Sequence, residues 1–210
     1  MTRLIGIYGA GGCGRGIMPL ARAMLLAEDA RLVFIDDGAA QSHINGHAVM
    51  SFARFNEEEA DDKHVALAVA ASAVRAEMAR KCDEAGLPLL SVWARDAIVM
   101  DNVEIAEGAL VSPYVTFTSN IKVGRCFHAN LYSYVEHDCV IGDYVTFAPG
   151  VRCNGNIRIG DRAYIGSGAV IRQNLTIGAD AVVGMGAIVT KDVPPGVTVV
   201  GNPARILEKN

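Results

Sequence analysis

The sequence predicts an α/β N-terminal domain, residues 1–92, followed by a three-sided column of short parallel strands, residues 93–210. The main observation is a period of six: from Val99 to Val189 every sixth residue is apolar, and no insertion breaks the series. The second is an alternation of strand-like and helical segments around a glycine loop near the start of the chain. The third is composition, since 51% apolar and 20% charged residues are typical of a globular chain with a buried core.

The N-terminal domain begins with an expected strand at Leu4–Tyr8, a short apolar run of the kind that is buried in parallel sheets. A glycine loop at residues 9–14 separates this strand from a helix. Four apolar residues share one face of that helix: Ile17, Leu20, Met24 and Leu25. The next strand is expected at Arg31–Ile35 and ends in Asp36 and Asp37. Strand, helix and strand together form a βαβ unit.

Three further elements are expected before the column. Residues 64–70 are predicted to form a third strand. Ser72 is predicted to cap a helix that stops at Gly86, because serine is a common helix cap and glycine a common helix end. A fourth short strand, at residues 88–92, is expected to lead directly into the column.

The glycine loop matches the pattern G-x-G-x-x-G, and Asp36 follows Gly14 by 22 residues. In a dinucleotide-binding domain such a loop and acid hold the pyrophosphate and a ribose. A complete NAD fold has about six strands, and only three or four are expected here, so a single nucleotide half-site is favoured over NAD(H). A simple tight turn is the other alternative, which the acidic pair at the strand end makes weaker.

The period of six predicts the geometry of the column. An α-helix repeats every 3.6 residues, whereas positions two apart in a strand share a face, so this period requires a short strand and a corner in every repeat. Three sides make one coil, and the sixteen repeats make a stack on the order of 25 Å tall. Glycine follows six of the apolar positions, which fits a corner that needs unusual backbone angles or has no room for a Cβ. A β-sandwich with coincidental spacing is the alternative, but its irregular loops would lose the phase.

His137 is the best candidate for chemistry in the column. It is expected at a corner between Glu136 and Asp138, and an imidazole beside a carboxylate can act as a general base near neutral pH. A solvated corner histidine paired with an acid is an equally good interpretation of these residues. His128 has no acidic neighbour and is expected to be structural. Two cysteines are expected to face the core as packing residues: Cys139 and Cys153.

Composition argues against several classes of function. A net charge of −4 without a run of basic residues argues against nucleic acid as a partner. The five cysteines contain no CxxC pair, and the column holds two histidines, so no metal site is predicted. No apolar run approaches the length of about 18 residues that a membrane span needs, and Arg3 and the glycines interrupt the first apolar run. Neither a membrane contact nor a signal peptide is therefore expected, and the predicted location is cytoplasmic.

Five motifs carry a resemblance to a known family. They are residues 8–14 (YGAGGCG), 34–37 (FIDD), 135–143 (VEHDCVIGD), 190–196 (TKDVPPG) and 200–205 (VGNPAR). With these motifs the chain resembles, over nearly its whole length, the bacterial hexapeptide-repeat sugar acyltransferases, a group of sialic acid O-acyltransferases and nucleotide-aminosugar N-acetyltransferases. The resemblance implies a half-Rossmann domain that binds the nucleotide sugar, a left-handed parallel β-helix, a homotrimer, and acetyl-CoA as co-substrate without a metal.

The resemblance also implies roles for single residues. His137 matches the family's catalytic base, and Asp138 matches the acid that raises its basicity. The positions that match substrate-binding residues are Gly11, Gly12, Cys13, Asp36, Asp37 and Ala70. The positions that match the acetyl-CoA groove are Thr146, Ser167 and Met185, with Gly155 where a backbone amide could face the thioester. Cys13 and Thr146 stand where some relatives carry histidine.

What the resemblance implies is an acetyl-CoA-dependent N-acetyltransferase in polysaccharide biosynthesis. The amino group of a nucleotide-linked amino-deoxy sugar is expected to attack the thioester directly, with a histidine as general base. Three alternatives stay open: an O-acetyltransferase for sialic acid or another sugar, an NAD-dependent oxidoreductase, and a non-catalytic nucleotide-sugar-binding protein. The residues do not define the nucleotide base, the sugar or the length of the acyl chain.

Overall fold

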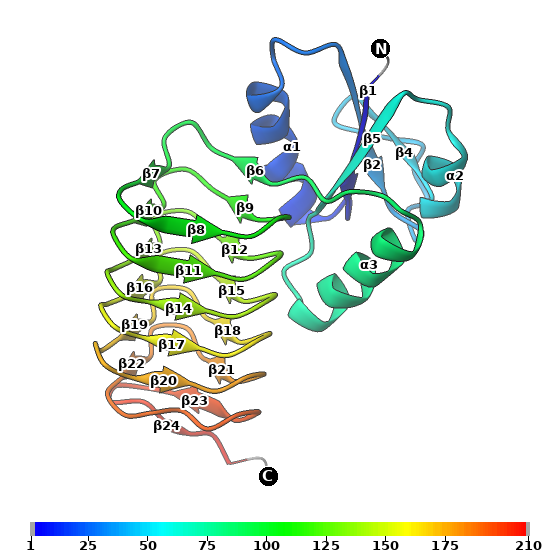
Figure 1. Cartoon of the computed structure of the whole chain (residues 1–210). Helices are drawn as coiled ribbons and strands as arrows, with labels where there is room; N and C mark the ends of the chain where they lie inside the picture. Colours follow the sequence, from blue (N-terminus) through cyan, green and yellow to red (C-terminus); the bar gives the residue numbers. More distant parts are fainter. Residues whose placement is uncertain (1–2, 209–210) are drawn as a thin grey trace.

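The computed structural model describes residues 3–208, which form an α/β domain and a three-sided left-handed β-helix beside it (Figure 1). The β-helix is the predicted column. No helix within the described range is long and apolar enough to cross a membrane.

The N-terminal sheet has five strands in the order β3-β4-β2-β1-β5. Their bounds are β1 (Arg3–Tyr8), β2 (Ala30–Ile35), β3 (His43–Ile44), β4 (His47–Met50) and β5 (Asp62–Leu67). β1 pairs in parallel with β2 and β5, β2 pairs in parallel with β4, and β3 pairs antiparallel with β4. The carboxyl ends of β1, β2 and β5 therefore meet at one edge of the sheet.

Three helices cover the two faces of this sheet. Their bounds are α1 (Gly12–Met24), α2 (Phe52–Glu57) and α3 (Ser72–Glu84). α1 packs on one face, where Ile17 and Ala21 join the cluster that contains Ile5 and Ile7. α2 and α3 cover the opposite face. The βαβ unit predicted from the apolar runs and the glycine loop is confirmed.

Other N-terminal predictions were wrong. Ser72 does not cap α3: the N-cap is Ala71 without a side-chain hydrogen bond, and Ser72 is the first helical residue. The strand predicted at residues 88–92 is absent, because Leu89 makes a single bridge to Val65 and the next strand belongs to the column. Residues 38–63, for which no element was predicted, contain β3, β4 and α2.

The column has three faces, each a ladder of parallel strands. The first face contains β6 (Val92–Trp93), β9 (Leu110–Val111), β12 (His128–Ala129), β15 (Thr146–Phe147), β18 (Tyr164–Ile165), β21 (Val182–Val183), β23 (Thr198–Val200) and β24 (Arg205–Ile206), of which β24 is antiparallel. The second face contains β7 (Ile98–Val99), β10 (Thr116–Phe117), β13 (Tyr134–Val135), β16 (Arg152–Cys153), β19 (Val170–Ile171) and β22 (Ile188–Val189). The third face contains β8 (Val103–Ile105), β11 (Ile121–Val123), β14 (Val140–Ile141), β17 (Arg158–Ile159) and β20 (Thr176–Ile177).

The register of the strands confirms the predicted coil length of 18 residues. Phe117 pairs with Val135, and Val135 pairs with Cys153. The apolar positions at the period of six are buried from Val111 onward. Val99, in contrast, is 46% exposed, because β7 is the first strand of its face and no coil covers it.

The faces meet at three edges, each a column of two-residue corners. The first edge, between the first and second faces, has corners at residues 113–114, 131–132, 149–150, 167–168 and 185–186. The second edge, between the second and third faces, has corners at residues 101–102, 119–120, 137–138, 155–156 and 173–174. The third edge, between the third and first faces, has corners at residues 125–126, 143–144, 161–162 and 179–180.

The six glycines that follow apolar positions are needed for space rather than for backbone angle. A Cβ on Gly142 would lie 2.3 Å from the Asp161 carboxylate oxygen, and one on Gly160 would lie 2.5 Å from the backbone nitrogen of Ala179. The left-handed backbone conformation occurs two residues later, at positions such as Tyr144, where φ is 58°. Of the two reasons that the sequence suggested for these glycines, steric exclusion of a Cβ is the correct one.

Arg75 of α3 joins the N-terminal domain to the first face of the column, and its side chain is fully buried. Its guanidinium donates to the backbone carbonyls of Val69 and Ala70 in its own domain. It also donates to the carbonyls of Cys126 and Tyr144 and to the Thr146 hydroxyl in the column. Burial lowers the pKa of Arg75 to about 10, so the side chain stays cationic at neutral pH. The loop after β5 is thereby fixed against the column.

Candidate active site

His137 lies at the second edge of the column, in the corner that follows β13. Its Nδ1 is 2.8 Å from Oδ2 of Asp138, and more than half of each side chain is exposed. A carboxylate accepts hydrogen bonds, so Nδ1 carries the proton and donates it to Asp138. In the neutral ring Nε2 then keeps a free lone pair, which is the arrangement of a general base.

Asp138 and His137 shift each other's protonation. The hydrogen bond to Asp138, followed by the negative charges of Asp138 and Glu136, raises the pKa of His137 above its usual value. The hydrogen bonds from His137 and then Asn120 lower the pKa of Asp138. The pair therefore favours an ionised carboxylate that stabilises the imidazolium after His137 has accepted a proton.

Gly155 lies one coil below His137, at the same edge, and leaves space for the imidazole ring. A Cβ at this position would lie 2.5 Å from Cε1 and 2.6 Å from Nε2 of His137. The Asn156 backbone N–H donates to the His137 carbonyl oxygen over 2.7 Å, which holds the two corners together. Any side chain at residue 155 would displace the ring.

The glycine loop brings the start of α1 to the carboxyl edge of the N-terminal sheet. Gly9 has φ of 108° and donates its N–H to the carbonyl oxygen of Ile35. Gly14 approaches Gly9 so closely that a Cβ would overlap the Gly9 carbonyl oxygen. Gly11, the N-cap of α1, provides no side-chain cap, and a Cβ on Gly11 or Gly12 would meet no atom within 4 Å. Space is therefore open beside the start of α1, and the N-terminus of a helix is a common place for phosphate to bind.

Asp36 and Asp37 hold the loops at this edge. The Asp36 carboxylate accepts from the backbone amides of Ala10 and Gly38, both over 3.0 Å. The Asp37 carboxylate accepts from the Tyr8 hydroxyl over 3.0 Å and from the Phe52 amide over 2.8 Å. Each oxygen has a further lone pair, so these bonds do not prevent a ligand from donating to the same carboxylates.

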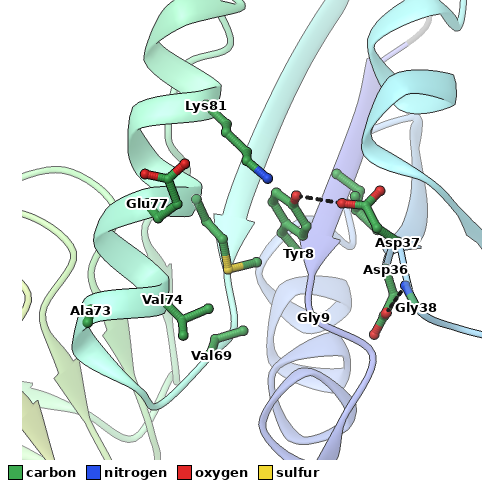
Figure 2. A pocket seen from close by; sticks show the side chains of 12 residues that line it. Tyr8, Gly9, Asp36, Asp37, Gly38, Val69, Ala73, Val74, Glu77 and Lys81 are labelled. Atoms are coloured by element: carbon green, nitrogen blue, oxygen red, sulfur yellow. Dashed lines mark hydrogen bonds between the residues drawn. The ribbon is translucent and has the colours of Figure 1, made fainter.

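A cavity of about 540 Å³ opens beside these carboxylates (Figure 2). Tyr8, Asp36 and Asp37 form one wall, and α3 forms the wall opposite with Glu77 and Lys81 (Figure 2). Figure 2 shows Lys81 extending from α3 toward the Tyr8–Asp37 pair. The lining also contains the apolar side chains of Val69, Ala73 and Val74. A mostly apolar lining with a few polar groups is typical of a small-molecule site.

A smaller cavity of about 240 Å³ lies where α1 meets the first face of the column. It brings together residues that were predicted separately for substrate and coenzyme, namely Gly12, Cys13, Ala70 and Thr146. Burial raises the pKa of the Cys13 thiol, so this side chain is neutral. Thr146 is buried, and its hydroxyl donates to the Ala70 carbonyl oxygen over 2.9 Å. Two residues that the sequence reasoning missed also line this cavity: Ser112 and Asn130.

His128, expected to be structural, is buried in the wall of the smaller cavity, and its Nε2 donates to the Leu67 carbonyl oxygen over 2.8 Å. Burial and the charge of Arg75 lower its pKa well below the usual value, so His128 is neutral. The two column cysteines expected to pack inward are buried: Cys139 and Cys153.

Ser167 and Met185 lie at the first edge of the column, in the corners that follow β18 and β21. Each precedes a glycine of positive φ, Gly168 and Gly186, and Met185 is 82% exposed. His137 lies at the second edge, so the second face separates it from these two residues within one chain. Among the described residues no group of three or more His, Cys, Asp or Glu side chains is arranged to hold a metal ion.

Two family models match the chain. The model of the PglD N-terminal domain matches residues 4–82. The bacterial transferase hexapeptide family, described by six repeats, matches residues 156–191.

Relatives match the chain over nearly its whole length. A protein of Escherichia coli O157:H7 named GDP-perosamine N-acetyltransferase is 45% identical, with 99% of this chain and 97% of the relative covered. The structure of WeeI from Acinetobacter baumannii AYE is 52% identical with a TM-score of 0.94, over 98% of this chain and all of that one. The acetyltransferase domain of PglB from Neisseria gonorrhoeae FA1090, solved in complex with acetyl coenzyme A, is 30% identical with a TM-score of 0.91 and covers 99% of this chain and 100% of that chain.

Proposed function

This chain belongs to the hexapeptide-repeat acyltransferase family that N-acetylates nucleotide-linked amino sugars, and we propose that His137 is its general base. The enzyme transfers the acetyl group of acetyl-CoA to the amino group of a nucleotide-linked amino-deoxy sugar. The observation that carries the assignment of the base is the His137–Asp138 pair at an exposed edge of the column, with the ring lying over Gly155.

The proposed reaction is a direct transfer. The lone pair of the sugar amine attacks the thioester carbonyl carbon, and the C–S bond breaks as the new C–N bond is completed. His137 Nε2 takes a proton from the attacking nitrogen, and the CoA sulfur leaves as a thiolate that is protonated to the free thiol. Asp138 stabilises the imidazolium, and the backbone N–H of Gly155 is the proposed donor to the thioester oxygen.

The nucleotide is proposed to bind at the carboxyl edge of the N-terminal sheet. The nucleoside fits the cavity beside Asp36 and Asp37. The diphosphate then faces the uncapped amides of Gly11, Gly12 and Cys13, since the N-terminus of a helix favours anions. The sugar extends past Ala70 toward the column. The relative named GDP-perosamine N-acetyltransferase makes GDP-perosamine the first acceptor to test.

The assembly is proposed to be a homotrimer in which neighbouring copies complete the site. Ser167 and Met185 lie at one edge of the column and His137 and Gly155 at another. If two copies place these edges against each other, the coenzyme lies in the seam between them. The cytoplasmic location and the role in polysaccharide biosynthesis that were expected from the sequence belong to the same proposal.

An acceptor panel tests this function. GDP-perosamine and UDP-, dTDP- and CMP-linked amino sugars are incubated with acetyl-CoA, and release of free CoA thiol is followed with a thiol reagent. The expected result is release that depends on both substrates, together with a mass increase of the sugar by one acetyl group. Binding of these nucleotides without thiol release would contradict an acetyltransferase and favour a nucleotide-sugar-binding protein.

A further inference from the structure

The second edge of the column carries a ladder of short polar side chains in the left-handed conformation. Five residues occupy equivalent positions one coil apart, with φ between 54° and 62°: Asn102, Asn120, Asp138, Asn156 and Asn174. Asparagine and aspartate tolerate this conformation better than other residues with a Cβ, which accounts for the residue types. Asp138 is the acid among these five residues, and it is also the partner of His137.

Side-chain hydrogen bonds join this ladder in two segments. Asn102 Nδ2 donates to Asn120 Oδ1 over 3.3 Å, and Asn120 Nδ2 donates to Asp138 Oδ1 over 3.2 Å. In the next segment Asn156 Nδ2 donates to Asn174 Oδ1 over 2.8 Å. The upper segment therefore ends on the carboxylate beside His137, and the lower segment does not reach it.

Chemistry fixes the direction of the upper segment. An ionised carboxylate only accepts hydrogen bonds, so Asn120 must turn its Nδ2 toward Asp138. Its Oδ1 is then the atom that faces Asn102, which in turn must present its own Nδ2. The orientation of both amides follows from the charge on Asp138.

The result is a carboxylate held at both oxygens. Oδ1 of Asp138 accepts from Asn120, and Oδ2 accepts from His137. The Asp138 side chain is 52% exposed and that of His137 is 59% exposed, so little packing restrains either one. An exposed side chain fixed at a single atom retains rotational freedom, whereas two anchors define the plane of the carboxylate.

We propose that Asn120 is a positioning residue for the acetyl transfer: it holds the Asp138 carboxylate in the plane that keeps Nδ1–H of His137 bonded and Nε2 directed at the substrate. This inference rests on the proposed function, because it takes His137 as the base. Asn120 acts through Asp138. Asn102 extends the same support by orienting the Asn120 amide.

The charged groups that act on His137 are few among the described residues. Asp138, Glu136 and the Cys139 thiol are the titratable groups that influence the ring, and all belong to its own corner. The neighbouring coils contribute Asn120 above and Gly155 and Asn156 below. Loss of the Asn120 bond therefore changes the imidazole chiefly through Asp138.

The test replaces Asn120 by glycine. Glycine adopts positive φ without strain, so N120G removes the amide and keeps the backbone. The matched control is N174G, which makes the same change at the same edge in the segment that does not reach Asp138. The variant N120D keeps the short side chain and places a second carboxylate against Asp138.

The expected effect of N120G is a fall in kcat of roughly tenfold, the size expected when one hydrogen bond to a charged group is lost at an exposed site. KM for both substrates stays unchanged. The acidic limb of kcat/KM moves to lower pH, because His137 loses part of the contact that raises its pKa. N120D is expected to reduce kcat at least as much, and N174G is expected to resemble the wild type.

An NMR titration of the His137 imidazole separates this inference from the proposed function, since it needs no turnover. A lower imidazole pKa in N120G than in wild type and N174G supports the positioning role even if no acceptor is acetylated. If the wild type is active while N120G matches N174G in kcat and in imidazole pKa, Asn120 does not position the base. A raised imidazole pKa in N120G would also overturn the proposal, because it would mean that Asn120 only weakens Asp138.

Discussion

Gly155 sets how closely the column approaches the ring of His137. Its missing side chain leaves the space in which the imidazole lies, since a Cβ would come within 2.5 Å of Cε1. The sequence assigned Gly155 only through resemblance, as a backbone amide near the thioester. Its steric role depends on a neighbour 18 residues away, which becomes visible only when the coil length is applied to polar corners as well as to the core.

Replacing Gly155 by alanine is therefore expected to reduce kcat roughly 10- to 100-fold, because a small displacement of a base is costly for catalysis. The His137 ring is exposed and can turn away, so the free energy of unfolding is expected to change by no more than about 0.5 kcal/mol. Steady-state kinetics and urea unfolding measure the two effects. G16A is the control, since a Cβ on Gly16 meets no neighbouring atom; equal kcat values in G155A and G16A would contradict the steric role.

The contact between His137 and Asp138 was predictable at this scale, and the contact between Asp138 and Asn120 was not. A histidine between two acids is visible in the sequence, and the resemblance implied that Asp138 is the acid that raises its basicity. The structure pairs His137 with Asp138. Asn120 was overlooked because its contact is made across coils, yet asparagines at 102, 120, 156 and 174 share the 18-residue spacing.

Among the secondary-structure elements, α3 helps to fix the N-terminal domain on the column through one side chain, that of Arg75. Arg75 donates to carbonyls of both parts from a fully buried position. Ser72 was predicted as a helix cap, but it lies inside the helix and faces the column, with its hydroxyl 3.4 Å from that of Thr146. The sequence around a serine does not show whether it caps a helix or lies in its first turn. Here the hydroxyl contacts Thr146, which lies 74 positions later in the chain.

Replacing Arg75 by methionine is expected to lower the free energy of unfolding by about 3 kcal/mol or more, since it leaves several buried carbonyls without donors. Urea unfolding measures the loss. R80M is the control on the same helix: Arg80 pairs with Glu77 and Glu84 at the surface, and exposed ion pairs contribute about 0–1 kcal/mol. Similar losses in R75M and R80M would show that Arg75 does not fix the domain to the column.

For the whole molecule, the six-residue period predicted the column and its coil length correctly. It could not predict the exposed start of the series at Val99, because period alone does not say where the stack begins. Residues 38–63 gave no strong pattern. Their short strands are held by pairing, β4 with β2 and β3 with β4, rather than by their own periodicity. The arrangement of copies depends on contacts between chains, which no pattern within one chain defines.

If neighbouring copies share the site, two inactive variants should complement each other. H137A alters the second edge and leaves the first edge intact, whereas S167W fills the first edge and leaves the second intact. When differently tagged chains are co-expressed, an intact site forms wherever the first edge of an H137A chain meets the second edge of an S167W chain. Random mixing leaves about a quarter of the seams with both edges unaltered in a cyclic trimer. The thiol-release rate of purified mixed trimers is expected to exceed that of either variant alone.

The control is a mixture of H137A and G155A. Both changes lie at the second edge, so every seam in this mixture contains an altered second edge. Absence of any gain in mixed trimers would place the whole site within one chain.

The central claim, that His137 is the base of a direct acetyl transfer, is tested most directly by the thiol-release rate of H137A with the acceptor found in the panel. The measurement is made at a pH above the acidic limb of the wild-type profile, on protein shown to be folded and assembled. The predicted result is a kcat lower by about 10²- to 10⁴-fold, the usual contribution of a general base. Turnover close to the wild-type rate in H137A would contradict the account.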